Sequence, residues 1–249
     1  MTIYFISDLH LKEENQENTK LFFRFLDTYA KNAKAIYILG DFFDAWVGDD
    51  YNTPFVRSIK NALVDLDKKN IAVFFMPGNR DFLIGKQFFK EIRCEPITDP
   101  YVIELNGEKI LLTHGDLLTT ADKEYGMFRK LAQHSITKFL FLRLPKRYRV
   151  IITHYFRNNS SNVYKRKLQK NPKVFEVSQI AVEALANKHH VNAIIHGHIH
   201  RSGVHEFVLA GRRCKRFVLG DWGRQAKILA YQNGKFELMK ISMPELLTY

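Results

Sequence analysis

Aspartate, asparagine and histidine residues gather in five short motifs, and an apolar run of the sequence leads into each of them. Their side chains offer carboxylate, carboxamide and imidazole ligands, which suit Mn²⁺, Fe²⁺ or Zn²⁺. No motif contains a cysteine, and this argues against a structural zinc finger. The motifs are Asp8-Leu9-His10, Gly40-Asp41 with Asp44, Gly78-Asn79-Arg80-Asp81, His114-Gly115-Asp116 and His196-Gly197-His198-Ile199-His200.

Each motif alone has an ordinary structural explanation, such as a helix cap, a turn or a satisfied polar side chain. Five of them at predicted strand ends indicate a single site. The ligands are too many for one ion but suffice for two ions that share a carboxylate, and such pairs commonly serve phosphoryl hydrolysis. The remaining histidines fit no motif and are interpreted as structural: His134, His154, His189, His190 and His205.

The first part of the chain alternates short apolar runs with helical periodicity. Residues 2–7, 35–39 and 71–76 predict buried strands, and residues 19–31 and 53–69 predict helices. Thr53 is expected to cap the second helix, with Pro54 at its first position. This rhythm predicts a parallel sheet, whose strands would present ligands at their carboxyl ends.

The second part of the chain has a different pattern. Asn106-Gly107 predicts a hairpin turn, and residues 175–188 and 191–195 predict a helix and a buried strand. The last fifty residues have the pattern of a strand meander. We therefore expect one α/β domain over residues 1–249, with two packed mixed sheets and helices outside. Residues 117–174 interrupt it as a basic, mostly helical insertion.

Positive charge is concentrated in that insertion. Residues 123–173 contain fourteen Lys or Arg against a single acid, Glu124, whereas the net charge of the whole chain is +12. The remaining chain therefore carries a net charge of −1. A partner with dense negative charge is indicated, which could be a phosphate-bearing substrate, a nucleic acid or an anionic lipid surface.

Membrane and redox signals are few. The N-terminus has no signal-peptide pattern, and no apolar run is long enough to span a bilayer. Cys94 and Cys214 are expected to be buried thiols in a reducing cytoplasm. Residues 139–145 are apolar beside basic charge. They could pack on the main body, or they could line an acyl-chain pocket at an anionic lipid surface.

Together the five motifs resemble the signature of the calcineurin-like metallophosphoesterases. This resemblance implies a four-layer α-β-β-α sandwich. More narrowly, the sequence resembles the UDP-2,3-diacylglucosamine pyrophosphatases of lipid A biosynthesis, which release UMP and 2,3-diacylglucosamine 1-phosphate (lipid X). The match is close up to about residue 130 and again around 175–220, but loose in the insertion and at the C-terminus. The segments that carry it are 7–11, 37–41, 45–50, 78–83 and 196–201.

The resemblance also implies roles for the motif residues. It implies hydrolysis by in-line attack of water activated by two ions, with Mn²⁺ as the expected metal. Asp41 would bridge the ions, and Asp41, Asn79, Arg80 and His196 would serve catalysis. One ion would be held by Asp8, His10, Asp41 and His198, and the other by Asp41, Asn79, His114 and His196.

Arg80 bears on the substrate class, because the wider superfamily usually has histidine there. Arginine stays charged and cannot protonate an alkoxide leaving group, but it can hold phosphate oxygens bidentately. A diphosphate needs little leaving-group protonation, so Arg80 favours a pyrophosphate bond. The residues expected to hold the substrate are Asn79, Arg80, Asp122, Ser160, Tyr164, Lys167 and His196, with Tyr164 in place of a smaller polar residue.

Two other functions stay open from the sequence. A nuclease or cyclic-nucleotide phosphodiesterase of the same superfamily could use the basic insertion on a phosphate backbone. A non-catalytic scaffold with this fold is the third possibility, although the complete ligand set argues against it. The apolar stripe favours a lipid-linked nucleotide sugar and an anionic membrane surface over nucleic acid. We expect peripheral association with the cytoplasmic face of the inner membrane and no obligate protein partner.

Overall fold

The computed structural model describes residues 1–119, 123–170 and 176–243, without the side chains of 123–125, 161, 162, 164, 165, 167, 168 and 170. Two mixed sheets form its centre. The six-stranded sheet has the order β11-β10-β1-β2-β3-β4 and the five-stranded sheet the order β5-β6-β7-β9-β8. Their bounds are β1 Thr2–Ile6, β2 Ala33–Leu39, β3 Ala72–Met76, β4 Glu95–Pro96, β5 Tyr101–Leu105, β6 Glu108–Thr113, β7 Ala193–His196, β8 Gly203–Leu209, β9 Arg212–Val218, β10 Gln225–Gln232 and β11 Lys235–Ser242.

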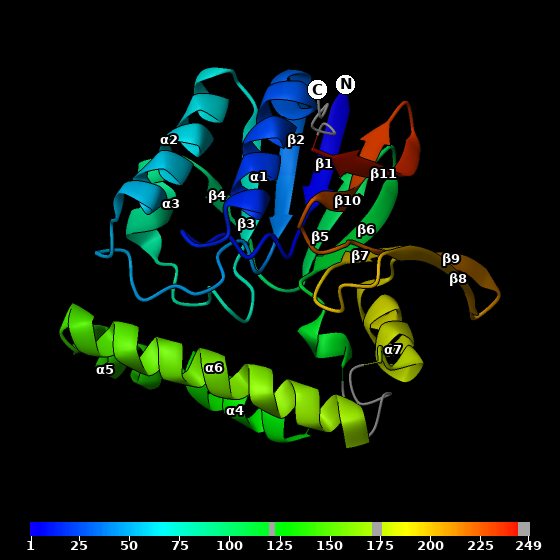
Figure 1. Ribbon diagram of the computed structural model, residues 1–249. Coiled ribbons are helices and arrows are strands. Elements are labelled where there is room, and N and C mark those ends of the chain that lie inside the picture. The colour runs from blue at the N-terminus through cyan, green and yellow to red at the C-terminus, as the bar shows by residue number, and fades with distance from the viewer. Residues whose placement is uncertain (120–122, 171–175, 244–249) are drawn as a thin grey trace, which may run out of the picture.

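Helices cover the outer faces of both sheets, which gives the four layers α-β-β-α (Figure 1). On the six-stranded sheet lie α1 (Gln16–Thr28), α2 (Pro54–Lys68) and α3 (Lys86–Ile92), and on the five-stranded sheet lies α7 (Gln179–His189). This confirms the predicted fold. No described helix is long and apolar enough to cross a membrane.

The alternation of side chains along β1 shows how the layers are held together. Tyr4 and Ile6 belong to the apolar core beneath the helices, whereas Ile3 and Phe5 belong to the core between the two sheets. Successive strand residues point to opposite faces, so a strand that is buried on both sides is apolar throughout. A third apolar cluster, which contains Val182 and Ala186 of α7, lies on the other side of the five-stranded sheet.

The structure bears out the main features of the sequence-based description. Strands β1, β2 and β3 run parallel, and Thr53 caps α2 through its side chain. Strands β5 and β6 form the hairpin predicted at Asn106-Gly107, and both cysteines are buried thiols. The prediction of a single C-terminal meander is wrong, because β8 and β9 join one sheet whereas β10 and β11 join the other.

Three helices connect β6 to the second part of the fold: α4 (Lys123–Gln133), α5 (Ser135–Arg143) and α6 (Lys146–Lys170). They form a separate group, which lies across the end of the molecule toward which β1 and β2 point (Figure 1). They fall within residues 117–174, whose treatment as an insertion into one domain stays a prediction. Their position places them next to the loops that carry the motifs.

Candidate metal centre

The motif residues sit where the chain leaves its strands in unusual backbone conformations. Gly40 has a φ of +88° and ends β2 in a turn that glycine adopts readily. Left-handed backbone is costly for other residues and is concentrated at functional sites. Five motif residues adopt it: Asp8 (56°), His10 (48°), Asp41 (52°), His198 (72°) and His200 (55°).

Backbone hydrogen bonds align the loops that follow β1 and β2. The amide of Asp8 donates to the carbonyl of Gly40 (3.1 Å), and that of His10 donates to the carbonyl of Asp41 (3.0 Å). The amide of Leu11 likewise donates to the carbonyl of Phe42 (2.9 Å). The carboxylates of Asp8 and Asp41 therefore emerge side by side from neighbouring parallel strands.

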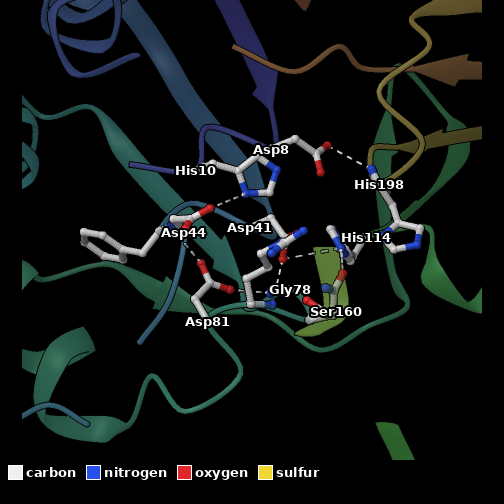
Figure 2. Close-up of polar contacts among 12 residues, drawn as sticks. Asp8, His10, Asp41, Asp44, Gly78, Asp81, His114, Ser160 and His198 are labelled. Carbon is white, nitrogen blue, oxygen red and sulfur yellow. Dashed lines mark hydrogen bonds and ion pairs between the residues drawn. The ribbon is translucent and has the colours of Figure 1, made fainter. Parts of the chain in front are cut away.

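The loop after β3 approaches Asp41 closely. A Cβ at Gly78 would strike the backbone nitrogen and Oδ1 of Asp41, so a side chain cannot fit there. Asp81 ties the two loops together, because its carboxylate accepts hydrogen bonds from the amides of Gly78 (2.7 Å), Phe42 (2.8 Å) and Phe43 (3.1 Å). Figure 2 shows Asp81 facing Gly78 beneath Asp41.

Asp8, His10 and His200 form a first group of possible ligands, whose ligand atoms all lie within 4.8 Å of one another. Nε2 of His200 is 3.2 Å from Nε2 of His10 and 3.4 Å from Oδ1 of Asp8. The other carboxylate oxygen of Asp8 is fixed by hydrogen bonds from Ser7 Oγ (2.6 Å) and the amide of His198 (2.9 Å). This leaves Oδ1 directed toward the two imidazoles.

Asp41, His114 and His198 form a second group, again with ligand atoms within 4.8 Å. Nε2 of His114 lies 3.6 Å from Oδ1 of Asp41 and 2.8 Å from Oδ1 of Asn79. The Asn79 carboxamide thus adjoins this group. Nδ1 of His114 is anchored by the carbonyl of Leu39 (3.0 Å), which keeps Nε2 pointed at the site.

The residues of both groups fit a pair of divalent ions. Oδ1 of Asp8, which faces the first group, is buried without a hydrogen-bond partner in the described part of the chain. Buried polar atoms are normally satisfied, and exceptions point to strain, function or a missing ion. The donors are oxygens and imidazole nitrogens, the set that Mn²⁺ and related dications accept.

The histidines of the centre differ in the direction in which the protein shifts their pKa. Burial lowers the pKa of His10 and of His198 to about 4, so both rings are neutral at physiological pH. Although burial also disfavours its charge, the carboxylates of Asp41 and Asp8 raise the pKa of His114 to about 9. Burial, with the charges of Asp8 and Asp116, raises the pKa of Asp41 to about 7.

His196 lies outside both groups, which differs from the ligand assignment that the resemblance implied. It shares a strand face with Ile194, which packs in the cluster beneath α7. Its Nε2 is 3.1 Å from Nη1 of Arg216, and its Nδ1 is 2.8 Å from the carbonyl of Gly197. Arginine can only donate, so Nε2 accepts and Nδ1 carries the proton. Neither nitrogen keeps a lone pair for a metal.

Arg80 borders the second group. Its backbone amide donates to Oδ1 of Asp41 (2.9 Å), and its Nε lies 3.5 Å from Oδ2 of the same carboxylate. The side chain is 25% exposed, so the guanidinium can reach a ligand from the solvent side.

The residues expected to hold the substrate are only partly described. Asp122 lies outside the described residues, as do the side chains of Tyr164 and Lys167. Ser160 is exposed on α6, and its hydroxyl donates to the carbonyl of Arg157 (2.9 Å). The substrate roles of these four residues stay predictions.

His200 and Arg157 are site residues to which sequence reasoning gave no role. The signal for His200 was present, since it stands in the same motif as His198 and follows the end of the strand. Arg157 donates to the Asp44 carboxylate from α6 at a separation of 113 residues, which no local pattern reveals.

Comparison with known proteins agrees with this fold. The calcineurin-like phosphoesterase family matches residues 1–202, and the chain belongs to this family. It is similar over nearly its whole length to proteins named UDP-2,3-diacylglucosamine hydrolase. That of Aeromonas salmonicida (strain A449) is 39% identical, covering 99% of this chain and 96% of the relative. Those of Pseudomonas entomophila (strain L48) and Stutzerimonas stutzeri (strain A1501) are each 41% identical, covering 95% and 90% of this chain and 97% and 92% of the relatives.

Proposed function

We propose that the protein hydrolyses the pyrophosphate bond of UDP-2,3-diacylglucosamine in lipid A biosynthesis. The products would be UMP and 2,3-diacylglucosamine 1-phosphate (lipid X). The observation that carries this proposal is the combination of end-to-end similarity to hydrolases of that name with two ligand groups set side by side at the strand ends.

The proposed ligand sets follow the geometry and differ from those that the resemblance implied. His200 takes the place of His198 at the first ion, and His198 takes the place of His196 at the second. Asp8, His10 and His200 would hold one ion, and Asp41, Asn79, His114 and His198 the other. Asp41 would be shared, since its loop lies between the loops of Asp8 and Asn79. Mn²⁺ is the proposed metal. When bound, the ions supply Lewis acidity and activate water for attack on phosphorus.

Charge balance supports an anionic substrate. The carboxylates of Asp8 and Asp41 neutralise only part of the positive charge of two dications, and Asn79 is a neutral ligand. The loaded site would therefore stay positively charged. Arg80 would hold oxygens of the diphosphate without donating a proton, because its guanidinium stays charged. A phosphate leaving group needs little protonation, so a fixed cation serves a diphosphate better than it would serve an alkoxide.

The lipid part of the substrate is proposed to meet the insertion. Asp122, Ser160, Tyr164 and Lys167 would hold the substrate there, and the enzyme would work peripherally at the cytoplasmic face of the inner membrane. Basic residues beside exposed apolar side chains favour such a surface. The exposed apolar side chains of the three helices include Met127, Phe128, Leu131, Ile136, Phe139, Leu140, Leu142, Tyr148, Ile151, Tyr155, Phe156 and Val163.

A substrate panel tests the proposal. The Mn²⁺-loaded protein would be given UDP-2,3-diacylglucosamine, unacylated UDP-N-acetylglucosamine and bis-p-nitrophenyl phosphate in parallel, and single-stranded DNA in a separate reaction. We expect UMP release from the diacylated substrate alone. Equal turnover of all three would contradict the proposal and favour a general phosphodiesterase of the same family. Hydrolysis of single-stranded DNA without UMP release would favour the nuclease.

A further inference from the structure

Two arginine–carboxylate pairs hold α6 against the loop after β2. Arg157 donates from Nε to Oδ2 of Asp44 (2.9 Å) and from Nη2 to Oδ1 (2.5 Å). About two helical turns earlier, Arg149 donates to both carboxylate oxygens of Asp50 (2.8 and 2.5 Å) and to the carbonyl of Val47 (2.7 Å). Bidentate pairing fixes the plane of each carboxylate.

The two pairs differ in what lies behind the carboxylate. Oδ1 of Asp44 is 3.9 Å from Nδ1 of His10, and both side chains are only 13% exposed. The side chain of Asp50 is 47% exposed, and its second cationic neighbour is Lys146, also on α6. The Asp44 carboxylate therefore faces the candidate metal centre, as Figure 2 shows. The Asp50 carboxylate instead pairs with two cations of the insertion.

The imidazole of His10 needs an acceptor on the side where Asp44 lies. Its Nε2 points to the first ligand group, 3.2 Å from Nε2 of His200. Its Nδ1 is buried and has no hydrogen-bond partner among the described residues. A metal-ligating histidine normally donates its other N–H to a carboxylate or carbonyl, which orients the ring. At 3.9 Å the Asp44 carboxylate is close enough to act on the ring, although the separation is longer than a hydrogen bond.

The backbone holds this approach in place. The amide of Asp44 donates to the carbonyl of Leu11 (3.1 Å), and Leu11 and Phe43 form a parallel bridge. The loop of His10 and the loop of Asp44 are therefore joined through their backbones. Arg157 supplies the remaining constraint, because it determines how the carboxylate is turned.

We propose that Asp44 and Arg157 form a positioning pair that orients His10 for metal binding and makes the first ligand group depend on the seating of α6. The inference rests on the metal-binding part of the proposed function and goes beyond it. Neither residue touches the reacting atoms. Asp44 acts through His10, and Arg157 acts through Asp44.

The test compares Asp44→Asn with the matched variant Asp50→Asn. The first binding constant for Mn²⁺ would be measured by calorimetry on the metal-free full chain, and amide hydrogen exchange would be followed over residues 146–160. Both variants should speed exchange in α6, because each loses one arginine–carboxylate pair. Only Asp44→Asn should weaken Mn²⁺ binding, by about 10- to 100-fold.

Two conservative variants separate the members of the pair. Asp44→Glu keeps a carboxylate and should recover part of the affinity. Arg157→Lys keeps the charge but loses the bidentate geometry, and should reduce affinity less than Asp44→Asn does. If Asp44→Asn or Arg157→Lys bound Mn²⁺ as tightly as the wild type, the positioning role would be wrong while the proposed function would stand. Failure of the wild-type protein to bind Mn²⁺ would overturn the proposed function together with it.

Discussion

The imidazole of His114 faces acceptors on both sides. Leu39 offers a carbonyl at 3.0 Å to Nδ1, and Asn79 offers its Oδ1 at 2.8 Å to Nε2. Both ring nitrogens act as donors only in the imidazolium form. The hydrogen bonds thus agree with a pKa raised to about 9 by Asp41 and Asp8 against the effect of burial. Nε2 must lose its proton before it can bind a metal.

Metal affinity should therefore depend on pH in a defined direction. The pKa values of Asp41 and His114 are raised, to about 7 and about 9, so their protonated forms compete with the metal. Affinity for Mn²⁺ should rise from pH 6 to pH 9, roughly tenfold per pH unit for each proton released. His10 and His198 should not contribute to this pH dependence, because burial lowers their pKa to about 4 and both are already neutral at pH 6.

Calorimetry of the metal-free protein in buffers of different ionisation enthalpy measures both the affinity and the protons released. Affinity that is constant over this range would contradict the assigned protonation of Asp41 and His114.

Replacing His200 and replacing His196 by alanine should have different effects on the protein. His200→Ala deletes a proposed ligand of the first ion and should lower the number of tightly bound Mn²⁺ ions from two to one. His196→Ala leaves Arg216 without its acceptor and should lower thermal stability, while two ions still bind. Metal analysis after dialysis, with a melting curve for each variant, checks both. The opposite pattern would restore the ligand set that the resemblance implied.

Residue types at this site could be predicted from sequence, but their partners could not. The motif that ends in His200 contains three histidines, and the sequence alone does not show which two leave the strand. The structure resolves this through strand alternation, because His196 shares the face of Ile194 beneath α7. The contact of Asp44 with Arg157 joins segments 113 residues apart, which single-sequence periodicity does not detect.

Loops between elements carry the site, and Asp81 holds two of them together. Its buried carboxylate accepts hydrogen bonds from the backbone amides of Gly78, Phe42 and Phe43, which belong to the loops after β3 and β2. Each amide would otherwise be left without an acceptor in a dry environment. Such groups cost about 1–3 kcal/mol apiece when unpaired.

Asp81→Asn should destabilise the fold by about 3 kcal/mol, since its amide group would face at least one of the three N–H donors. Urea unfolding measures this loss. Asp65→Asn is the control, because Asp65 is an exposed residue of α2 whose carboxylate pairs with Lys68 at the surface. Equal unfolding midpoints for Asp81→Asn and the wild type would show that Asp81 does not join the loops.

Elements with strong local signals could be predicted, and those set by distant pairing could not. Strands β1 to β3 are apolar on both faces, and Thr53 with Pro54 marks the start of α2. Strand β4 contains only Glu95 and Pro96 and has no pattern of its own. The strands β8 to β11 each look like members of a hairpin, but local alternation does not say to which sheet a hairpin belongs.

At the scale of the whole molecule, the basic insertion uses part of its charge internally. Arg149 and Arg157 pair with carboxylates of the loop after β2, and Arg129 pairs with Asp116. Lys138 donates to the carbonyl of Phe82 (2.9 Å). Each of the three helices thus contacts a loop of the metal centre through a cation.

Binding to anionic vesicles should therefore depend on both charge and apolar contact. The protein should bind vesicles containing phosphatidylglycerol, and binding should weaken as salt screens the basic residues. Phe139→Ser with Leu140→Ser should reduce binding further, because both side chains are exposed on α5. The matched control is Val204→Ser with Val208→Ser, exposed on β8 far from the insertion in the sequence.

Co-sedimentation measures this partition. Equal binding to vesicles of neutral lipid, or an equal loss in both double variants, would remove the insertion from the proposed membrane contact.

Asp41 is proposed to join two metal sites whose ligands come from the ends of neighbouring strands. An anomalous difference map from crystals of the Mn²⁺-loaded protein tests it most directly. We predict two peaks that flank the Asp41 carboxylate, one beside Asp8, His10 and His200 and the other beside Asn79, His114 and His198. A single peak, or a peak coordinated by His196, would contradict the proposed pair of sites.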